Sequence, residues 1–443
     1  MAAAYDYDVL YLGSGHGTFD GAIPLAKSGQ RVGVIEADMI GGTCPNYGCN
    51  AKITLDAPVV LQRLQERLSA IVPGEAKIDW HQNYLHKQEV IEALPQMIGA
   101  TMKDAGIDLI HGKGEFQDAH TILVDGKPKT AAKIVIATGL RPHRLNIPGD
   151  ELAHDSRDFM ALQTLPERIA IIGAGYISME FATMANAAGA DVTILMHGDR
   201  ALRQFDPQAV DIVVKDLEDR GVTFVANARV ASLSQEGDET LVHYADGKTL
   251  TTDWVLDASG RIPNTEGIGL EKIGVKYDAH GIIVDDHLQT SVAGIYASGD
   301  VLKKSAPQST PAAAFESNYL TKSFIGETQA PIVYPVMPKV VFTSPRIAQV
   351  GVTKKEAQEN HDLISEEDLT KDWYWQVDRE KIAKNTLIFD HEHHLTGVVN
   401  VSDRAEDIVN QLLPLIQFKT TKDQINQLIY LFPTLQHSIL GKL

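Results

Sequence analysis

The sequence predicts an α/β protein with two strand–helix–strand units, followed by a C-terminal region of different character. Three observations support this prediction. An apolar strand at residues 7–12 runs into the glycine-rich turn GSGHGT at residues 13–18, and a second such strand, residues 168–172, runs into GAG at residues 173–175. From residue 334 onward, short strands alternate with helices. A chain of 443 residues has room for three domains, each with its own core.

The first unit has the pattern of a dinucleotide-binding fold. A helix and a second apolar strand follow the turn, and that strand ends at Glu36. Gly13 permits the tight turn, Gly15 lets the backbone approach a pyrophosphate, and Glu36, about twenty residues on, is placed to bind ribose hydroxyls. The third fingerprint position is Thr18 instead of glycine, with Gly17 one place early.

The second unit repeats this pattern downstream. The turn GAGYIS at residues 173–178 is followed by a predicted helix at 179–188 and a predicted strand at 191–196. Two such units imply two bound dinucleotides, which is what the reduction of a flavin by a nicotinamide requires.

The segment GGTCPNYGC, residues 41–49, holds the only two cysteines of the chain, Cys44 and Cys49. Structural disulfides are rare in reducing compartments, and two cysteines are too few for a zinc site unless histidines complete it. Directly after a nucleotide-binding unit, the pair is interpreted as a dithiol that cycles between oxidised and reduced states.

Further motifs extend the pattern over nearly the whole chain: ATG at 137–139, ASGR at 258–261, YASGD at 296–300 and TP at 310–311. With these motifs the chain resembles the class I pyridine nucleotide-disulfide oxidoreductases, the group of glutathione reductase, dihydrolipoamide dehydrogenase and mercuric reductase. The resemblance implies an FAD-dependent oxidoreductase that passes electrons from NAD(P)H through the flavin and the Cys44–Cys49 disulfide to a disulfide or another small-molecule acceptor.

The same resemblance implies two Rossmann-like dinucleotide-binding domains and an α+β dimerisation domain. We expect an FAD-binding domain at residues 1–150 and 265–325, with a helical insertion at 58–108, and an NAD(P)H-binding domain at 151–264. Residues 334–443 would form the interface domain, which in the family builds a homodimer and lends residues to the partner's active site.

By resemblance, Cys49 is the charge-transfer thiolate against the flavin and Cys44 is the interchange thiol that attacks the substrate. Lys52 and Glu180 match a lysine and an acid that pair near the flavin. The segment after Cys49 lacks the usual proline, so the match of Lys52 to the family's lysine holds to within one residue.

Three more residues inherit roles at the cofactor. Asp300 matches the aspartate that binds the flavin ribityl chain, Thr310 a position near the flavin ring, and Gly114 a glycine beside the adenine. The expected cofactor-binding residues are Gly13, Gly15, Gly17, Glu36, Gly42, Thr43, Gly114, Thr138, Gly139, Asp300, Thr310, Gly173, Gly175, Ile177, His197, Arg203 and Gly260.

The end of the second strand–helix–strand unit bears on the choice of nicotinamide. NAD enzymes place an acid there to hold both ribose hydroxyls, whereas NADP enzymes use cations for the 2′-phosphate. Met196 occupies the acid position, and His197, Arg200 and Arg203 follow. We therefore expect NADPH, with NADH as a possible substitute.

The C-terminus departs from the family. Relatives end in a His-Pro-Thr segment with a glutamate five residues after the histidine, which is the catalytic acid/base. Here the segment is LFPTLQH at 431–437, so Phe432 replaces the histidine and His437 stands in the glutamate's place. Phenylalanine cannot transfer a proton, so Tyr430, His437 or a substrate group substitutes, or the acceptor needs no proton. The candidate catalytic residues are Cys44, Cys49, Lys52, Glu180, Tyr430 and His437.

The acceptor stays open at this point: a low-molecular-weight disulfide, a metal ion held by thiolates, a quinone or dioxygen. The alternative is a redox-sensing flavoprotein with little turnover. The net charge of −18 argues against nucleic acid, and no apolar run is long enough to span a bilayer. The N-terminus has no signal-peptide pattern, so we expect a cytoplasmic protein. The histidines at 391–394 are expected in a solvated turn, and no metal site is expected.

Overall fold

The computed structural model describes residues 5–245 and 247–440, which fall into two compact units. The first unit takes its residues from Met1–Thr54, Leu85–His143 and Arg261–Tyr334, and the second from Leu55–Tyr84, Arg144–Gly260 and Pro335–Leu443. The helices α3 (Cys49–Arg67) and α4 (Trp80–Ile91) each pass from one unit into the other. The division into three domains stays a prediction, since the second unit holds residues of two of them.

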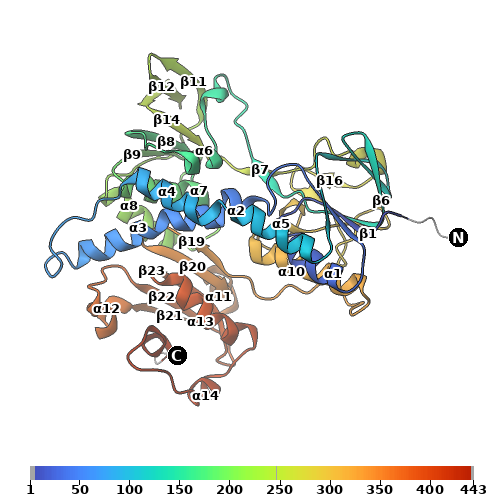
Figure 1. The fold of residues 1–443 in the computed structure, drawn as a ribbon. Coiled ribbons are helices and arrows are strands. Elements are labelled where there is room, and N and C mark those ends of the chain that lie inside the picture. Colours follow the sequence, from blue (N-terminus) through green and yellow to red (C-terminus); the bar gives the residue numbers. More distant parts are fainter. Residues whose placement is uncertain (1–4, 246, 441–443) are drawn as a thin grey trace. The chain divides into compact units, whose positions relative to one another are not determined.

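The first unit is built on a parallel sheet around β1 (Tyr7–Leu12), which has the bounds that the apolar run predicts (Figure 1). On one side lie β2 (Val32–Glu36) and β3 (Asp108–His111), and on the other β6 (Lys127–Ile136) and then β18 (Ile295–Ala297), all parallel. β1, β2 and the last three residues of β6 are almost wholly apolar and buried, as expected of the centre of a parallel sheet covered on both faces.

Two helices of the first unit, α1 (Phe19–Lys27) and α10 (Thr310–Phe324), pack closely against each other. A Cβ on Gly21 of α1 would lie 2.3 Å from the backbone oxygen of Ser317, and Gly21 N donates a hydrogen bond of 2.9 Å to Ser317 Oγ. The other elements of this unit are α2 (Thr43–Tyr47), α5 (Leu94–Asp104), β4 (Gly114–Asp118), β5 (Thr121–Val124), β7 (Leu140–Pro142), β15 (Arg261–Pro263), α9 (Leu270–Ile273), β16 (Tyr277–Asp278), β17 (Gly281–Ile282) and η2 (Gly299–Val301).

The second unit contains a four-stranded parallel sheet in the order β10-β9-β8-β14. Its central strand β8 (Arg168–Ile172) has the predicted bounds, α7 (Tyr176–Ala187) begins three residues before its predicted start and ends one residue early, and β9 (Asp191–Leu195) ends one residue before its predicted end. The same unit holds β10 (Thr223–Val225), β14 (Trp254–Asp257), α8 (Pro207–Asp219), α6 (Ser156–Ala161), η1 (Asp150–Leu152) and the antiparallel strands β11 (Val230–Glu236), β12 (Glu239–Tyr244) and β13 (Lys248–Thr252).

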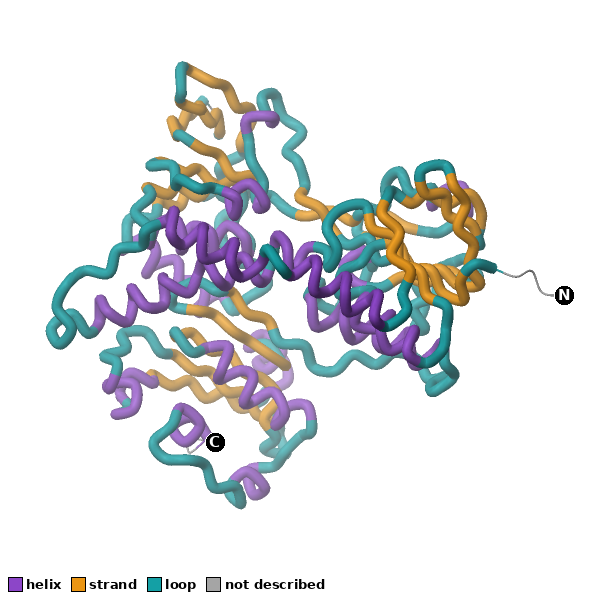
Figure 2. Tube along the Cα trace, viewed as in Figure 1, coloured by secondary structure: helices purple, strands orange, loops and turns teal. Residues whose placement is uncertain are grey.

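The C-terminal part of the second unit is a five-stranded antiparallel sheet, with α13 (Ala405–Gln417) packed against two of its strands, β20 and β23 (Figure 2). The buried face of α13 and the inner faces of the strands form one apolar core. The elements are β19 (Lys339–Val341), β20 (Arg346–Gly351), α11 (Lys354–Asn360), β21 (Leu363–Asp368), η3 (Leu369–Lys371), α12 (Trp373–Val377), β22 (Lys384–Phe389), β23 (Leu395–Ser402), α14 (Lys422–Ile425) and α15 (Leu435–Leu440). Among the described residues, no helix is long and apolar enough to cross a membrane.

Candidate functional site

The first glycine turn connects β1 to α1 through close backbone contacts. Gly13 has φ +106°, and a Cβ there would lie 2.4 Å from the oxygen of Ala137. Thr18 Oγ1 donates a hydrogen bond of 2.8 Å to Gly13 O, which explains how threonine replaces the third glycine of the fingerprint. Gly17 is the glycine that lets a neighbouring segment come close, because a Cβ at this position would lie only 3.1 Å from the oxygen of Ser298.

Glu36, at the end of β2, points its carboxylate back to this turn. Ser14 donates to Glu36 Oε2 from its backbone N at 2.9 Å and from Oγ at 2.6 Å, and Asp38 N donates to Oε1 at 2.8 Å. The carboxylate is therefore fixed at the mouth of the turn, where a ribose would bind.

A second glycine segment approaches the turn from the side of the cysteines. Gly42 has φ +68°, and a Cβ there would lie 2.9 Å from the Cα of Gly15. A side chain at Gly42 would therefore separate the two segments. Because Thr43, the first residue of α2, follows Gly42 in sequence, this contact places the start of α2 beside the glycine turn at residues 13–18.

Asp300 completes the candidate cofactor cradle. It lies in η2, and its Oδ1 is buried without a hydrogen-bond partner among the described residues. Burial raises the pKa of this carboxyl, and the charges of Lys304 and Arg261 oppose the shift. A buried carboxylate oxygen without a partner fits the hydroxyls of a ribityl chain, so the residues present fit FAD.

The remaining FAD-site candidates also lie in the first unit. Thr138 Oγ1 donates a hydrogen bond of 2.7 Å to Asn264 O, and Gly139 has φ +67°. Gly114 begins β4, and a Cβ there would lie 2.6 Å from Leu12 Cδ1.

The two cysteines lie at the junction of α2 and α3. Cys44 is half-buried in α2, Cys49 is the exposed first residue of α3, and their side chains are hydrogen-bonded to each other. Cys49 Sγ also lies 3.5 Å from Thr310 Oγ1, at the start of α10.

The two thiols differ in acidity. The hydrogen bond from Cys44 lowers the pKa of Cys49 to about 6, against the effect of burial and with help from Thr310 and the charge of Lys52. The same hydrogen bond, together with burial, raises the pKa of Cys44. The position of Cys49 at a helix N-terminus also favours a thiolate. The pair thus holds one negative charge, centred on Cys49.

Asn50 is a neighbour of the dithiol that the sequence analysis missed. Cys44 Sγ lies 3.8 Å from Asn50 Oδ1, a second acceptor for the one S–H hydrogen that Cys44 donates to Cys49. The sequence did carry a signal for this contact, because Asn50 is a polar residue directly after a redox cysteine. The family resemblance, however, gave no role to this position.

The second glycine turn has the geometry of the first. Gly173 has φ +110°, and a Cβ there would lie 2.4 Å from the oxygen of Ala258. Gly175 is the N-cap of α7 and has open space where a Cβ would be, and Ile177 lies in the first turn of that helix. Gly260 lies two residues beyond Ala258 in the same unit.

The residues expected to select the nicotinamide lie after β9. The guanidinium of Arg203 packs against the backbone of Gly198, so closely that a Cβ there would lie 1.7 Å from its Nη2. Arg200 Nη2 donates a hydrogen bond of 2.9 Å to Arg203 O, and His197 is exposed. The two arginines therefore form one basic turn.

Glu180 is buried in α7, and its Oε1 accepts a hydrogen bond of 3.0 Å from Phe342 N. Lys52 belongs to the first unit and Glu180 to the second, so their pairing stays a prediction.

The C-terminal segment carries an aromatic cluster. The exposed ring of Phe432 lies 5.7 Å from that of Trp373 and 5.0 Å from that of His437, between ring centroids. Tyr430 packs against the core of the C-terminal sheet, and burial raises its pKa. The segment before Phe432 exposes further apolar side chains: Leu428, Ile429 and Leu431.

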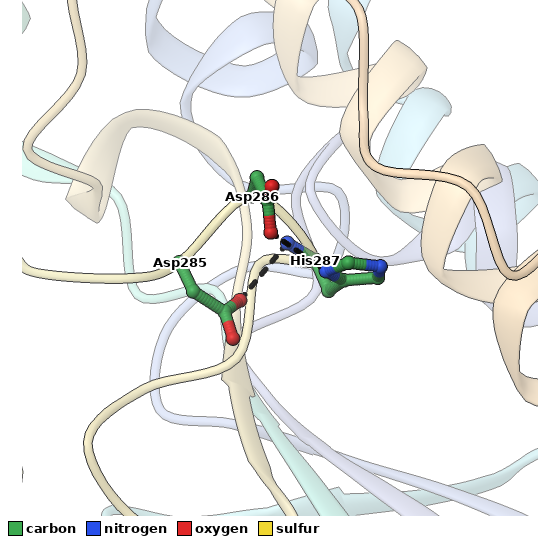
Figure 3. A group of neighbouring side chains, drawn as sticks. All are labelled: Asp285, Asp286 and His287. Carbon is green, nitrogen blue, oxygen red and sulfur yellow. Dashed lines mark hydrogen bonds and ion pairs between the residues drawn. The ribbon is translucent and has the colours of Figure 1, made fainter.

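One cluster of possible metal ligands, Asp285, Asp286 and His287, lies in the first unit (Figure 3). Both carboxylates already bond to His287: Asp285 Oδ1 accepts from its backbone N at 2.9 Å, and Asp286 Oδ1 lies 2.7 Å from its Nδ1. Both aspartates are exposed, and the arrangement is that of an ordinary polar turn. Residues 391–394 lie in the turn between β22 and β23, as predicted.

Comparisons with known proteins identify the family of this chain. Residues 7–317 match the pyridine nucleotide-disulphide oxidoreductase family, and residues 337–441 match the dimerisation domain of that family. The chain is 30% identical to mercuric reductase of Lysinibacillus sphaericus, over 98% of this chain and 81% of the relative. It is 27% identical to glutathione reductase of Nostoc sp., over 97% of this chain and 98% of the relative.

Solved structures give the same result. The HOCl-induced flavoprotein disulfide reductase RclA from Escherichia coli is similar with a TM-score of 0.89 at 27% identity, over 99% of both chains. Its Cu(II) complex is similar with a TM-score of 0.88 at 27% identity, over 98% of both chains. The chain therefore belongs to the FAD- and pyridine nucleotide-dependent family of pyridine nucleotide-disulphide oxidoreductases, and it is a flavoprotein oxidoreductase with the close cysteine pair Cys44 and Cys49.

Proposed function

We propose that this enzyme uses NADPH to reduce acceptors that need no proton from the protein, chiefly thiophilic metal ions and activated disulfides. The observation that carries the proposal is the combination of an acidic thiol at Cys49 with an aromatic ring at position 432. The dithiol can hold a thiolate, whereas the segment that carries the family's acid presents phenylalanine.

When bound, FAD supplies the two-electron carrier between nicotinamide and dithiol. On the protein side, Cys44 and Cys49 accept two electrons and one proton as their S–S bond breaks, which leaves the Cys49 thiolate and the Cys44 thiol. A disulfide acceptor takes up the two electrons, the proton of the Cys44 thiol and one further proton from solvent, and leaves as two thiols while the Cys44–Cys49 bond re-forms. A divalent thiophilic ion takes up the two electrons without a proton, so its reduction is not slowed by phenylalanine at position 432.

Relatives support the metal ion as an acceptor class. One relative is named mercuric reductase, and RclA has been solved as a Cu(II) complex. Soft thiolate ligands select such ions, and Cys44 and Cys49 offer two sulfur atoms side by side. In this chain a disulfide acceptor instead needs Tyr430, His437 or its own acidic thiol for the proton.

The finer assignments belong to the same proposal. Arg203 and Arg200 support NADPH over NADH, because guanidinium groups bind phosphate with charge-assisted hydrogen bonds. The dimerisation domain supports a homodimer as the working form, and we place the enzyme in the cytoplasm.

An anaerobic experiment tests the proposal. The purified protein should be yellow, NADPH should bleach it within a single turnover, and a thiophilic metal ion should restore the colour faster than glutathione disulfide does. A colourless protein that takes up no added FAD contradicts the proposal. Bleaching without reoxidation by any acceptor would favour the low-turnover redox sensor instead.

A further inference from the structure

Next to the turn that carries Asp300, the first unit contains a buried ion pair, Lys304 and Glu316, to which the sequence analysis assigned no role. Lys304 Nζ lies 2.5 Å from Glu316 Oε1, with side-chain exposures of 6% and 0%. Tyr334 OH donates a hydrogen bond of 2.7 Å to the same oxygen. Burial and the charge of Glu316 raise the pKa of Tyr334. Lysine and glutamate are rarely buried unless they are paired, so this placement needs a reason.

The pair is bonded to the backbone that presents Asp300. Gly299 N donates a hydrogen bond of 2.7 Å to Glu316 Oε2, and Gly299 O accepts one of 3.3 Å from Lys304 Nζ. Both polar groups of the residue before Asp300 are thus held by the pair. Gly299 has φ +79°, a left-handed conformation that sets the direction in which Asp300 leaves the turn.

Lys304 also acts on the pKa of Asp300 through its charge. Lys304 and Arg261 are the cations whose charges oppose the effect of burial on this carboxyl. Asp300 Oδ1 has no partner of its own among the described residues, so its orientation depends on the turn that carries it.

A neighbouring lysine shows that sequence position alone does not produce this arrangement. Lys303 Nζ lies 2.6 Å from Asp278 Oδ2, but those side chains are 47% and 38% exposed. An exposed pair of this kind contributes little to stability or binding. Lys303 therefore provides a matched control, one residue away and with the same charge.

We propose that Lys304, Glu316 and Tyr334 are positioning residues for FAD, which hold the Gly299–Asp300 turn so that Asp300 meets the flavin's ribityl hydroxyls. The inference rests on the proposed function, since it requires that this cradle binds FAD. Glu316 lies on α10, six residues after Thr310. The same helix therefore contacts the turn that carries Asp300, through Glu316, and the dithiol, through Thr310.

The test measures FAD binding by apo-protein, from the quenching of flavin fluorescence, for Lys304→Met, Glu316→Gln, Lys304→Arg and the control Lys303→Met. Breaking a buried pair is costly, so we expect Lys304→Met and Glu316→Gln to weaken FAD binding by about tenfold or more. Lys304→Arg retains the charge and should lose less, and Lys303→Met should stay within about twofold of the unmodified protein.

A merely structural role is recognised by a second readout, the thermal unfolding of the apo-protein. Apo-proteins that unfold at lower temperature but bind FAD as tightly as the unmodified chain would overturn the proposal, as would an equal loss in Lys303→Met. If Lys304→Met and Glu316→Gln fail to fold, Tyr334→Phe decides, because it removes only one hydrogen bond. A several-fold weaker FAD complex supports the proposal, and an unchanged one overturns it. If the unmodified protein itself binds no FAD, the proposed function fails first.

Discussion

The acidity of Cys49 depends on a hydrogen bond that a single substitution can remove. Cys44 is the largest contributor to the low pKa, about 6, of Cys49. In Cys44→Ala this donor is lost, so we expect the pKa of Cys49 to rise toward the ordinary value of ~8.5. In Cys44→Ser a hydroxyl donor remains, so the pKa should stay well below that of Cys44→Ala. Neither variant can form the disulfide, so Cys49 remains reduced in both.

The size of the effect decides the assay. At pH 7 a thiol of pKa ~6 is about 90% thiolate and one of pKa ~8.5 about 3%, a ratio of ~30. The more acidic thiolate is also less nucleophilic, by roughly tenfold for this difference at a Brønsted slope of ~0.45. Alkylation rates at pH 7 would then differ by only about threefold, so a single rate is a poor test.

The inflection of the pH–rate profile separates the two variants clearly. Iodoacetamide alkylation of Cys49, followed by mass spectrometry, should show an inflection near pH 6 to 7 in Cys44→Ser and near ~8.5 in Cys44→Ala. Identical inflections in the two variants would refute the role of the Cys44 hydrogen bond, and would leave Thr310 and Lys52 to explain any low value.

Three further predictions follow from other parts of the chain. Burial and the charge of Asp403 raise the pKa of Glu380 to about 7, so between pH ~4.5 and 7 the folded state holds a proton that the unfolded state has lost. The free energy of unfolding should therefore fall as pH rises through this range, by up to ~3 kcal/mol. In Glu380→Gln, the free energy of unfolding measured with urea should depend less on pH over the same range. Phe432→His combined with His437→Glu should raise turnover with glutathione disulfide by ~10²-fold, the lower end of general acid–base catalysis, and no gain would show that the acid is not what limits this acceptor. Arg203→Met should lower kcat/KM for NADPH by ~10–100-fold with little effect on NADH, and an equal loss with both nucleotides would contradict 2′-phosphate recognition.

The parts of the fold that the sequence predicted well are those fixed by local backbone chemistry. Gly13 and Gly173 mark turns in which no side chain fits, so the adjacent strands β1 and β8 have the predicted bounds. A helix end is less sharply encoded: α7 begins at Tyr176, three residues before the predicted start, because Gly175 serves as its N-cap.

The parts that escaped prediction depend on contacts between segments. Glu316 lies in a helix whose sequence gives no sign that this carboxylate is wholly buried against Lys304 and Gly299. Gly21 was likewise unremarkable in sequence, although it lets α1 touch α10. Such pairings arise from tertiary packing, which neither hydrophobic periodicity nor motif spacing encodes.

The uncovered apolar segment before the C-terminus has a consequence for handling this enzyme. Ile429 is 100% exposed, Leu431 81% and Phe432 66% in the single chain, within the part that matches the dimerisation domain. We expect the proposed homodimer to cover this strip, so a dissociated subunit would present it to other chains, and exposed apolar patches promote aggregation. Dilution should therefore shorten the half-life of the enzyme at elevated temperature, because irreversible loss would proceed through the separated subunit.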